Sequence, residues 1–458
     1  MDSKHIAALG LLAGDPSRVL TNPQVVEQLS RDFYWYSPVL RKQLDGKLGD
    51  VVVQPLSAEE IQKVLRYCYG NSIPVTARGA GTGNYGQAVP LEGGVVLDLA
   101  RMDRIEQIQP DGVAVCQPGV RLGDLENEAR KSGWELRCYP STIIKASVGG
   151  FVSGGSGGIG TVAHGGLRDF QTVRALEVVT MEPEPRLMHH EGEAVHDILH
   201  AWGTNGIITR IWLALTPAVE WSQCIVAFNT FAAALDFGEK IATGPAWIKR
   251  LVTVFEWPIP SFFTPIRQHA PEGKTLIFFM IASSQLAELE AAIRRSAGVV
   301  THSGIYPGLN ARPLLSDYTW NHTTLWAMRS DEAYTYLQCG FNHDTVRDQI
   351  SQLRERYGQE ILFHMEFMKN GEGRVVPGAI PVVYFTTEER LDDMIEFCRK
   401  IGVFVANPHV NNVEGGGRYR PDNVQLLAKM RYDPKGLLNP GKMVTFHSES
   451  TTAGAPTK

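Results

Sequence analysis

The sequence predicts an α+β protein made of two parts, and three observations carry this prediction. Short apolar runs typical of strands alternate with amphipathic runs typical of helices along the chain. Glycine makes up 45 of the 458 residues and is concentrated in two clusters within the first half. From about Trp221 glycine becomes sparser and aromatic residues denser, which indicates a second domain.

The first half is expected to contain six strands and three helices. Ser57 and Glu60 form a capping box, in which each side chain satisfies a free backbone amide, and Gly70 ends the helix that they open. Strands are expected at residues 50–56, 73–77, 95–99, 112–118, 174–180 and 207–215, and further helices at 122–132 and 193–202.

The second half repeats the alternation with different residues. Strands are expected near 228–231, 274–282 and 376–385, helices over 286–298, 344–358 and 387–402, and a last helix over 424–432. We therefore predict an N-terminal helical segment (1–45), a first domain (46–218), a second domain (219–415), a C-terminal segment that returns to the first domain (416–446) and a disordered tail (447–458).

Composition excludes several classes of protein. Apolar residues make up 43% and charged residues 20%, with a net charge of −5, as in a soluble folded protein that has no dedicated nucleic-acid surface. The six cysteines contain no CxxC pair, which argues against an iron–sulfur cluster, a c-type haem site and a zinc ribbon. We expect reduced thiols, no signal peptide, no membrane span and a cytoplasmic location.

The first glycine cluster, Gly79–Gly86, contains the spacing GxGxxG at Gly81, Gly83 and Gly86. In the usual dinucleotide fold this spacing opens a helix and is followed by an acidic residue about 20 positions later. Here Pro90 and two further glycines prevent a long helix, and Asp98 ends a strand only 12 residues on. The cluster is therefore not expected to bind a nicotinamide cofactor.

Glycine loops without a helix can still bind phosphate, because consecutive backbone amides form an anion-binding nest. Four glycines fall in 79–86, and nine of the 18 residues from 149 to 166 are glycine. Flexible linkers are the alternative interpretation, but two linkers inside an alternating run of strands and helices would be unusual.

Four blocks of the first half, in this order, resemble one family. They are PVTARGAGTG (74–83), YPSTIIKASVGGFVSGGSGG (139–158), LEVV (176–179) and GTNGIIT (203–209). Together they resemble the FAD-binding domain of the vanillyl-alcohol oxidase/p-cresol methylhydroxylase (PCMH) superfamily. The ending DPKGLLNPGKM (433–443) is similar to that of the FAD-linked lactate/glycolate oxidase branch. The resemblance implies a two-part PCMH-type FAD-binding domain and a separate α+β cap domain over the flavin.

Carried over by position, the resemblance implies which residues hold FAD. The pyrophosphate would lie on the backbone of the first cluster, the ADP and flavin ring along the second block, the adenine on the backbone of Ile208, and the NPGK segment near the flavin. These residues are Gly79, Ala80, Gly81, Thr82, Gly83, Pro140, Ser141, Thr142, Gly149, Gly150, Ser153, Gly154, Ile208, Asn439 and Lys442. In members that attach the flavin covalently from this first loop, a histidine stands where Ala80 stands here, so noncovalent FAD is expected, with a covalent bond from another segment as the open alternative.

Hydride transfer from a hydroxyl-bearing carbon needs a base, and histidine suits this role because its pKa lies near neutrality. His409 is the first candidate and His364 the second. The 2-hydroxy acid branch often binds a divalent metal, but this chain lacks the histidine that would follow Glu414, so no metal is predicted. His409, His364, Glu366 and Glu414 remain an alternative set of ligands. Tyr419 and Arg420 resemble the pair that stabilises a phenolate in the alkylphenol-oxidising branch.

The preferred function is FAD-dependent oxidation of a small 2-hydroxy acid of the lactate or glycolate type. Two alternatives stay open: oxidation of 4-hydroxybenzylic alcohols or alkylphenols, and a flavin-binding subunit of an electron-transfer complex. The expected partners are a small anionic substrate and an electron acceptor, which is oxygen, a quinone or another protein. No nucleic acid is expected, and a homodimer stays open.

Overall fold

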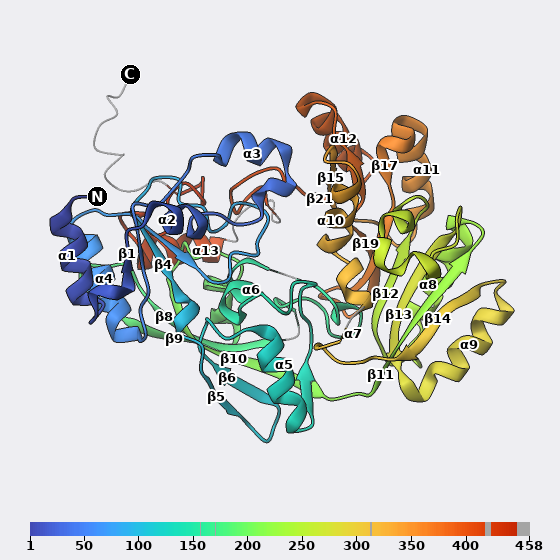
Figure 1. Cartoon of the computed structure of the whole chain (residues 1–458), viewed down its shortest axis with the longest axis horizontal. Helices are drawn as coiled ribbons and strands as arrows, with labels where there is room; N and C mark the ends of the chain where they lie inside the picture. Colours follow the sequence, from blue (N-terminus) through green and yellow to red (C-terminus); the bar gives the residue numbers. More distant parts are fainter. Residues whose placement is uncertain (156, 170, 312–313, 417–422, 447–458) are drawn as a thin grey trace.

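The computed structural model describes the chain except residues 156, 170, 312–313, 417–422 and 447–458. The described residues form two lobes, which lie side by side in Figure 1. The first lobe contains the blue to teal segments and the second the yellow to orange segments. Strands in the described residues form four sheets, two in each lobe.

The first sheet of the first lobe has the order β1-β2-β4-β3, in which β4 pairs parallel with both β2 and β3. Its strands are β1 (Val19–Leu20), β2 (Val51–Val53), β3 (Val75–Arg78) and β4 (Val95–Asp98). The helices α1 (Ser3–Leu12), α2 (Pro23–Leu29), α3 (Pro38–Leu44) and α4 (Ala58–Gly70) belong to this region. Apolar faces of α1 and α4 pack on β2, β3 and β4 in one buried cluster.

The second sheet of this lobe is antiparallel, with the order β5-β6-β10-β8-β9 and β7 beside β10. Its strands are β5 (Ile105–Ile108), β6 (Val113–Cys116), β7 (Trp134–Leu136), β8 (Val173–Val179), β9 (Leu187–Glu191) and β10 (Ile207–Pro217). The helices α5 (Leu122–Lys131), α6 (Val148–Gly154) and α7 (Thr161–His164) are part of this stretch. All six strands expected in the first half are present, with small differences at their ends.

Three local expectations need correction. Ser57 Oγ accepts a hydrogen bond from Glu60 N at 3.3 Å, but Glu60 turns to Leu56 N and Arg18, so the capping box is only half formed. The second glycine cluster is not a free loop throughout, because residues 148–154 fold as α6, with Ser147 at its N-cap. The helix expected over 193–202 is a 3-10 segment at Gly192–Asp197.

The second lobe is built on a sheet with the order β14-β11-β13-β12-β18-β19-β16-β21. Its strands are β11 (Trp221–Phe228), β12 (Lys249–Phe255), β13 (Thr275–Ala282), β14 (Val299–Ile305), β16 (Gln338–Gly340), β18 (His364–Lys369), β19 (Val375–Ala379) and β21 (Phe404–Ala406). A smaller sheet contains β15 (Tyr334–Tyr336), β17 (Ile361–Leu362) and β20 (Val382–Tyr384).

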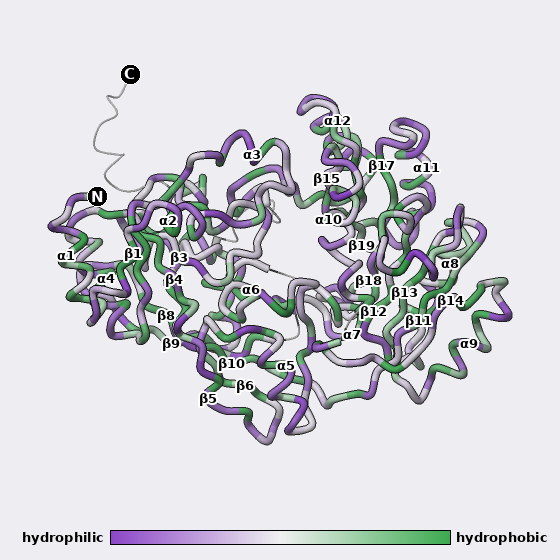
Figure 2. Tube along the Cα trace, viewed as in Figure 1, coloured by the Kyte–Doolittle hydropathy of each residue, from purple (hydrophilic) through white to green (hydrophobic). Residues whose placement is uncertain are grey.

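Five helices belong to this lobe within the described residues: α8 (Phe231–Thr243), α9 (Leu286–Arg295), α10 (Asn321–Ser330), α11 (Val346–Tyr357) and α12 (Glu388–Lys400). In Figure 2 the neighbouring strands β11 and β13 are mostly green, whereas the outer helices alternate between green and purple. Every residue of β11, β12 and β13 is buried, because helices or loops cover both faces of this part of the sheet.

The C-terminal segment returns to the first lobe. After α13 (Asn423–Tyr432), Leu438 forms a bridge with Val75 of β3, and Asn439 N donates to Val75 O at 2.8 Å. Figure 1 shows α13, in red, beside the strands of the first lobe.

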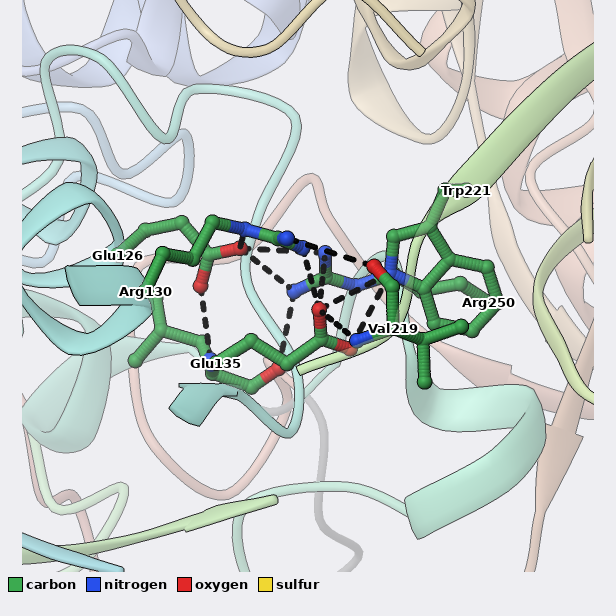
Figure 3. Close-up of polar contacts among 7 residues, drawn as sticks. Glu126, Arg130, Glu135, Val219, Trp221 and Arg250 are labelled. Carbon is green, nitrogen blue, oxygen red and sulfur yellow. Dashed lines mark hydrogen bonds and ion pairs between the residues drawn. The ribbon is translucent and has the colours of Figure 1, made fainter. Parts of the chain in front are cut away.

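A buried ionic cluster joins the two lobes (Figure 3). Arg250 of β12 lies between Glu126 of α5 and Glu135 of β7, and it donates to Glu126 Oε1 at 3.1 Å and to the carbonyl of Leu136 at 3.0 Å. Trp221 Nε1 donates to Glu135 Oε2 at 2.9 Å. The ion pairs thus connect a strand of the second lobe to a helix and a strand of the first.

Candidate active site

A cavity of about 570 Å³ lies between the two lobes. Thirteen of the 15 residues expected to hold FAD line it: Gly79, Ala80, Gly81, Thr82, Gly83, Pro140, Ser141, Thr142, Gly149, Gly150, Ser153, Gly154 and Ile208. The second lobe closes the other side with residues of α10, β16, β18, β19 and β21. Segments far apart in the sequence therefore meet around one space.

The glycines allow the two backbone loops to approach each other closely, and they place no side chains in the cavity. Ser147 Oγ accepts from Ala80 N and Gly150 N, each at 3.3 Å, which ties the first glycine loop to the start of α6. A Cβ on Gly79 would meet Ser147 Oγ at 2.4 Å, and one on Gly149 would meet Pro118 Cβ at 2.4 Å. Gly81 adopts φ +63°, which favours glycine. A side chain at Gly79 would break the junction of the two loops, and one at Gly149 would collide with Pro118.

Several buried polar atoms of the cavity wall have no partner among the described residues. They are Trp202 Nε1, Trp320 Nε1 and Asn321 Oδ1, all from residues that line the cavity. Buried polar groups are normally hydrogen-bonded, so orphaned atoms at a cavity indicate a polar ligand. The glycine cradle and these atoms together fit a long dinucleotide such as FAD.

The remaining two expected FAD residues lie behind the cavity wall. Asn439 Nδ2 donates to the carbonyls of Gln87 (2.8 Å) and Trp202 (2.7 Å), and both of those residues line the cavity. Lys442 is buried, and its Nζ has no hydrogen-bond partner in the described part of the chain. Burial lowers the pKa of Lys442, and the nearby Asp32 opposes this shift. Asn439 thus holds two segments of the wall together, and the Lys442 ammonium interacts electrostatically with Asp32 of the wall.

Asp32 and Arg78 put two further charges at the first glycine loop. Both are buried and line the cavity. Burial raises the pKa of Asp32 although its carboxylate accepts from Tyr34 N and Ala88 N, and burial lowers the pKa of Arg78. A Cβ on Gly81 would meet the Arg78 guanidinium, so this cation lies directly beside the loop expected to hold the pyrophosphate.

A fixed carboxylate marks the second-lobe wall of the cavity. Glu366 of β18 is 2% exposed and lines the cavity. Its Oε2 accepts from Thr253 Oγ1 at 2.6 Å, and its Oε1 accepts from Trp320 N at 2.9 Å. His364 Nε2 lies 2.9 Å from the same Oε1, and the His364 ring stacks on Phe255. His364 therefore reaches the cavity through Glu366, and it is not itself part of the lining.

Trp320 lies at a strained point of the wall. This bulky residue adopts φ +52°, a sparsely populated backbone conformation for any residue except glycine. Its amide is held by Glu366, and the chain enters α10 directly after it, with Asn321 and His322 in the first turn. Asn321 and His322 both line the cavity and are half-buried. Glu366 thus fixes the segment that presents His322.

The structure does not place His409, the first candidate for the base, at the cavity. It is 4% exposed and is not among the residues that line the cavity. Its Nδ1 lies 2.7 Å from Ser37 Oγ and its Nε2 2.9 Å from the carbonyl of Tyr336. Burial lowers the pKa of His409 to about 4. Because both ring nitrogens are engaged inside the protein, His409 as placed links α3 to β15 and does not face a substrate.

The other candidates divide into two groups. Tyr419 and Arg420 lie outside the described residues. Glu414 Oε1 accepts from Thr445 N at 2.8 Å, away from His364 and Glu366. Within the described chain no three His, Cys, Asp or Glu side chains come together as a metal site.

Residues not singled out from the sequence complete the site. Tyr85 Oη donates to Gln338 Oε1 at 2.5 Å, and this contact joins the lobes at the cavity. Lys369 at the end of β18 also lines it. In the sequence, His322 stands in the run WNHT (320–323), and nothing in that pattern separates it from the other histidines.

Comparison with known proteins gives a consistent result. Residues 49–184 match the family described as "FAD binding domain". A D-lactate dehydrogenase of Anaerostipes hadrus is 32% identical over 479 residues, covering 93% of this chain and 95% of the relative. A D-lactate dehydrogenase of Archaeoglobus fulgidus is 26% identical, covering 86% of this chain and 91% of the relative.

A solved structure shares the fold. An alkyldihydroxyacetonephosphate synthase matches with a TM-score of 0.71 over 93% of this chain and 82% of that chain. At 16% sequence identity, this likeness concerns the fold alone.

These findings and the glycine-lined cavity define an FAD-dependent oxidoreductase. The chain belongs to the vanillyl-alcohol oxidase/p-cresol methylhydroxylase superfamily, nearest the branch of the FAD-linked lactate and glycolate oxidases. The predicted α+β fold and the FAD cofactor are confirmed. No helix in the described residues is long and apolar enough to cross a membrane.

Proposed function

We propose that this protein oxidises a small 2-hydroxy acid of the lactate type to the 2-oxo acid, with FAD as the hydride acceptor. Two observations support the proposal. The relatives that match over most of the chain are D-lactate dehydrogenases. The second-lobe wall of the cavity also combines a histidine, His322, with a cation, Lys369, and a fixed carboxylate, Glu366.

The chemistry divides between these groups. Bound FAD supplies the acceptor for the hydride that leaves the carbinol carbon. His322 takes the hydroxyl proton, since an imidazole titrates near neutrality and lines the cavity. Lys369 provides the positive charge that suits the substrate carboxylate. Glu366 and His364 act as positioning residues, because Glu366 binds the amide of Trp320, two residues before His322. The presence of a histidine and a cation on one wall of the flavin cavity is the observation that carries the proposal.

Anaerobic reduction of the flavin tests the substrate class. We expect D-lactate to bleach the oxidised flavin absorbance near 450 nm, whereas vanillyl alcohol leaves it unchanged. Reduction by vanillyl alcohol and not by D-lactate would favour the benzylic alternative instead. A flavin that none of the hydroxy acids or benzylic alcohols reduces would favour an electron-transfer subunit.

Replacing the proposed base should slow the chemical step. We expect His322→Ala to lower the rate of flavin reduction by D-lactate about 10²-fold, the usual contribution of a general base. His189→Ala is the matched control, because His189 lies on β9 and is 48% exposed. If His322→Ala reduces its flavin at the wild-type rate, the base is another group.

The attachment of the flavin follows from Ala80. Because no histidine stands at this position of the first loop, we expect FAD to be held noncovalently. Precipitation with trichloroacetic acid should release the yellow flavin into the supernatant. Flavin that stays with the protein pellet would contradict this expectation.

A further inference from the structure

A second cavity, of about 810 Å³, lies behind the flavin cavity and has no part in the function proposed above. It is bordered by α7, the end of α8, the start of β12, the loop after β16 and the β18–β19 hairpin. Its volume falls in the range of small-molecule binding sites.

The wall of this second cavity carries an unpaired positive charge. Lys249 is 7% exposed, and its Nζ donates to the carbonyl of Gly244 at 2.7 Å. An ammonium has three donors, and Lys249 makes no ion pair within the described residues. Burial and the neighbouring Lys369 lower the pKa of Lys249 to about 8.

The lining also contains other charged side chains, and within the described residues none of them pairs with Lys249. Lys369 and Arg374 are cationic, His343 lies 3.2 Å from Glu239, and Asp344 is the carboxylate among the lining residues. Arg374 pairs with Glu372 at the turn of the hairpin. An anionic ligand would supply the missing partner of Lys249.

Apolar side chains contribute to the same wall. Val162, Trp247, Phe341 and Val375 are among the residues that contribute. A buried cation beside aliphatic and aromatic surface suits a ligand with one carboxylate and an apolar body, because the cation can pair with the carboxylate and the apolar surface can contact the apolar body.

A thin partition separates this cavity from the flavin cavity. Lys369 lines both of them. On α7, Thr161 faces the flavin cavity whereas Val162 and Ala163 line the second one. In the hairpin turn, Gly371 lines the flavin cavity and Gly373 the second cavity. A ligand in the second cavity would therefore press on walls that also shape the flavin site.

We propose that the second cavity is a binding site for a small carboxylate with an apolar body, separate from the substrate site, with Lys249 as the group that recognises the carboxylate. The proposal does not depend on the identity of the oxidised substrate, because its test measures binding and not turnover.

Titration calorimetry of the FAD-loaded protein with benzoate tests the site. We expect benzoate to bind, and its neutral analogue benzamide to bind at least tenfold more weakly. Lys249→Met should weaken benzoate binding at least tenfold. His322→Ala should leave it unchanged, because His322 lies in the flavin cavity.

A second variant keeps the test decisive if Lys249→Met fails to fold. Val376 is a half-buried residue of β19 that lines the cavity, so Val376→Phe should fill the cavity while keeping Lys249 and Lys369. This variant should also weaken benzoate binding. Absence of benzoate binding to the wild type would overturn the proposal. So would binding that His322→Ala abolishes and that Lys249→Met and Val376→Phe retain.

Discussion

At the scale of single residues, the histidines show how burial decides a role. His409 stands among polar neighbours in the sequence, which suggested a base. The fold instead encloses it between Ser37 and the Tyr336 carbonyl, where a neutral imidazole satisfies both contacts. His322, in contrast, is half-buried at the cavity.

This burial predicts a pH dependence of stability. The pKa of His409 is about 4 in the folded protein and about 6.5 in an unfolded chain. At a pH between these two values, His409 is therefore protonated in the unfolded state and neutral in the folded state. The free energy of unfolding should therefore fall as the pH drops from 6.5 to 4, by up to about 1.4 kcal/mol per pH unit from this group.

The variant His409→Gln removes this titration while its amide can still donate to Tyr336 O. Urea unfolding at several pH values should show a shallower slope for His409→Gln than for the wild type. The half-exposed His343 provides the control His343→Gln, which should keep the wild-type slope. Identical slopes for wild type and His409→Gln would show that His409 is not buried as a neutral ring.

At the scale of elements, the two glycine clusters have different structures and one purpose. The first remains an irregular loop after β3, whereas the second begins as α6. Ser147 Oγ joins them by accepting from an amide of each. The close approach of the two backbones explains why small residues recur there.

This junction gives a prediction for FAD affinity. Gly79→Ala would place a methyl group 2.4 Å from Ser147 Oγ and 3.3 Å from the Gly150 backbone, so the loops must separate. We expect FAD to dissociate at least tenfold more readily, measured by fluorescence of released flavin. Gly70→Ala is the matched control, because its Cβ would meet nothing within 4 Å. Equal affinities for both variants would contradict a tight junction.

At the scale of the whole molecule, the site exists because two lobes are held in one arrangement. Arg250 is 2% exposed, and its guanidinium lies 4.7 Å from the centre of the Tyr139 ring, next to Pro140 of the cavity wall. Burial opposes the charge of Arg250, but Glu126 and Glu135 raise its pKa. The cluster in Figure 3 therefore connects lobe packing to the flavin site.

Removing the cation should destabilise the protein strongly. Arg250→Met leaves Glu126 and Glu135 buried with less positive charge, and breaking such a pair typically costs about 3–5 kcal/mol. Arg347→Met is the control, since Arg347 is 51% exposed in its pair with Asp236 and should cost less than about 1 kcal/mol. Urea unfolding measures both. A loss below about 1 kcal/mol for Arg250→Met would exclude a stabilising role for the cluster.

Much of the fold was predictable from local pattern. The strands of the first half follow from runs such as residues 51–53 and 95–98, because a buried strand needs continuous apolar side chains. The glycine spacing without a following helix excluded the usual dinucleotide fold, and the positions of 13 cavity residues followed from the four-block resemblance. These features are local in sequence.

The sequence by itself determined the cofactor class, since close backbone approach to a dinucleotide requires glycine at particular positions, and this requirement is written into adjacent residues. Only the tertiary structure decided which histidines meet the cavity, namely His322 of the second lobe and the buried His200 of the first. His322 of α10 and Glu366 and Lys369 of β18 line the same cavity. His409 is held away from it by its contacts with Ser37 and Tyr336, which are separated from it by 372 and 73 positions in the sequence. Which side chains line the cavity depends on burial and on long-range packing, and these produce no periodic pattern in the sequence.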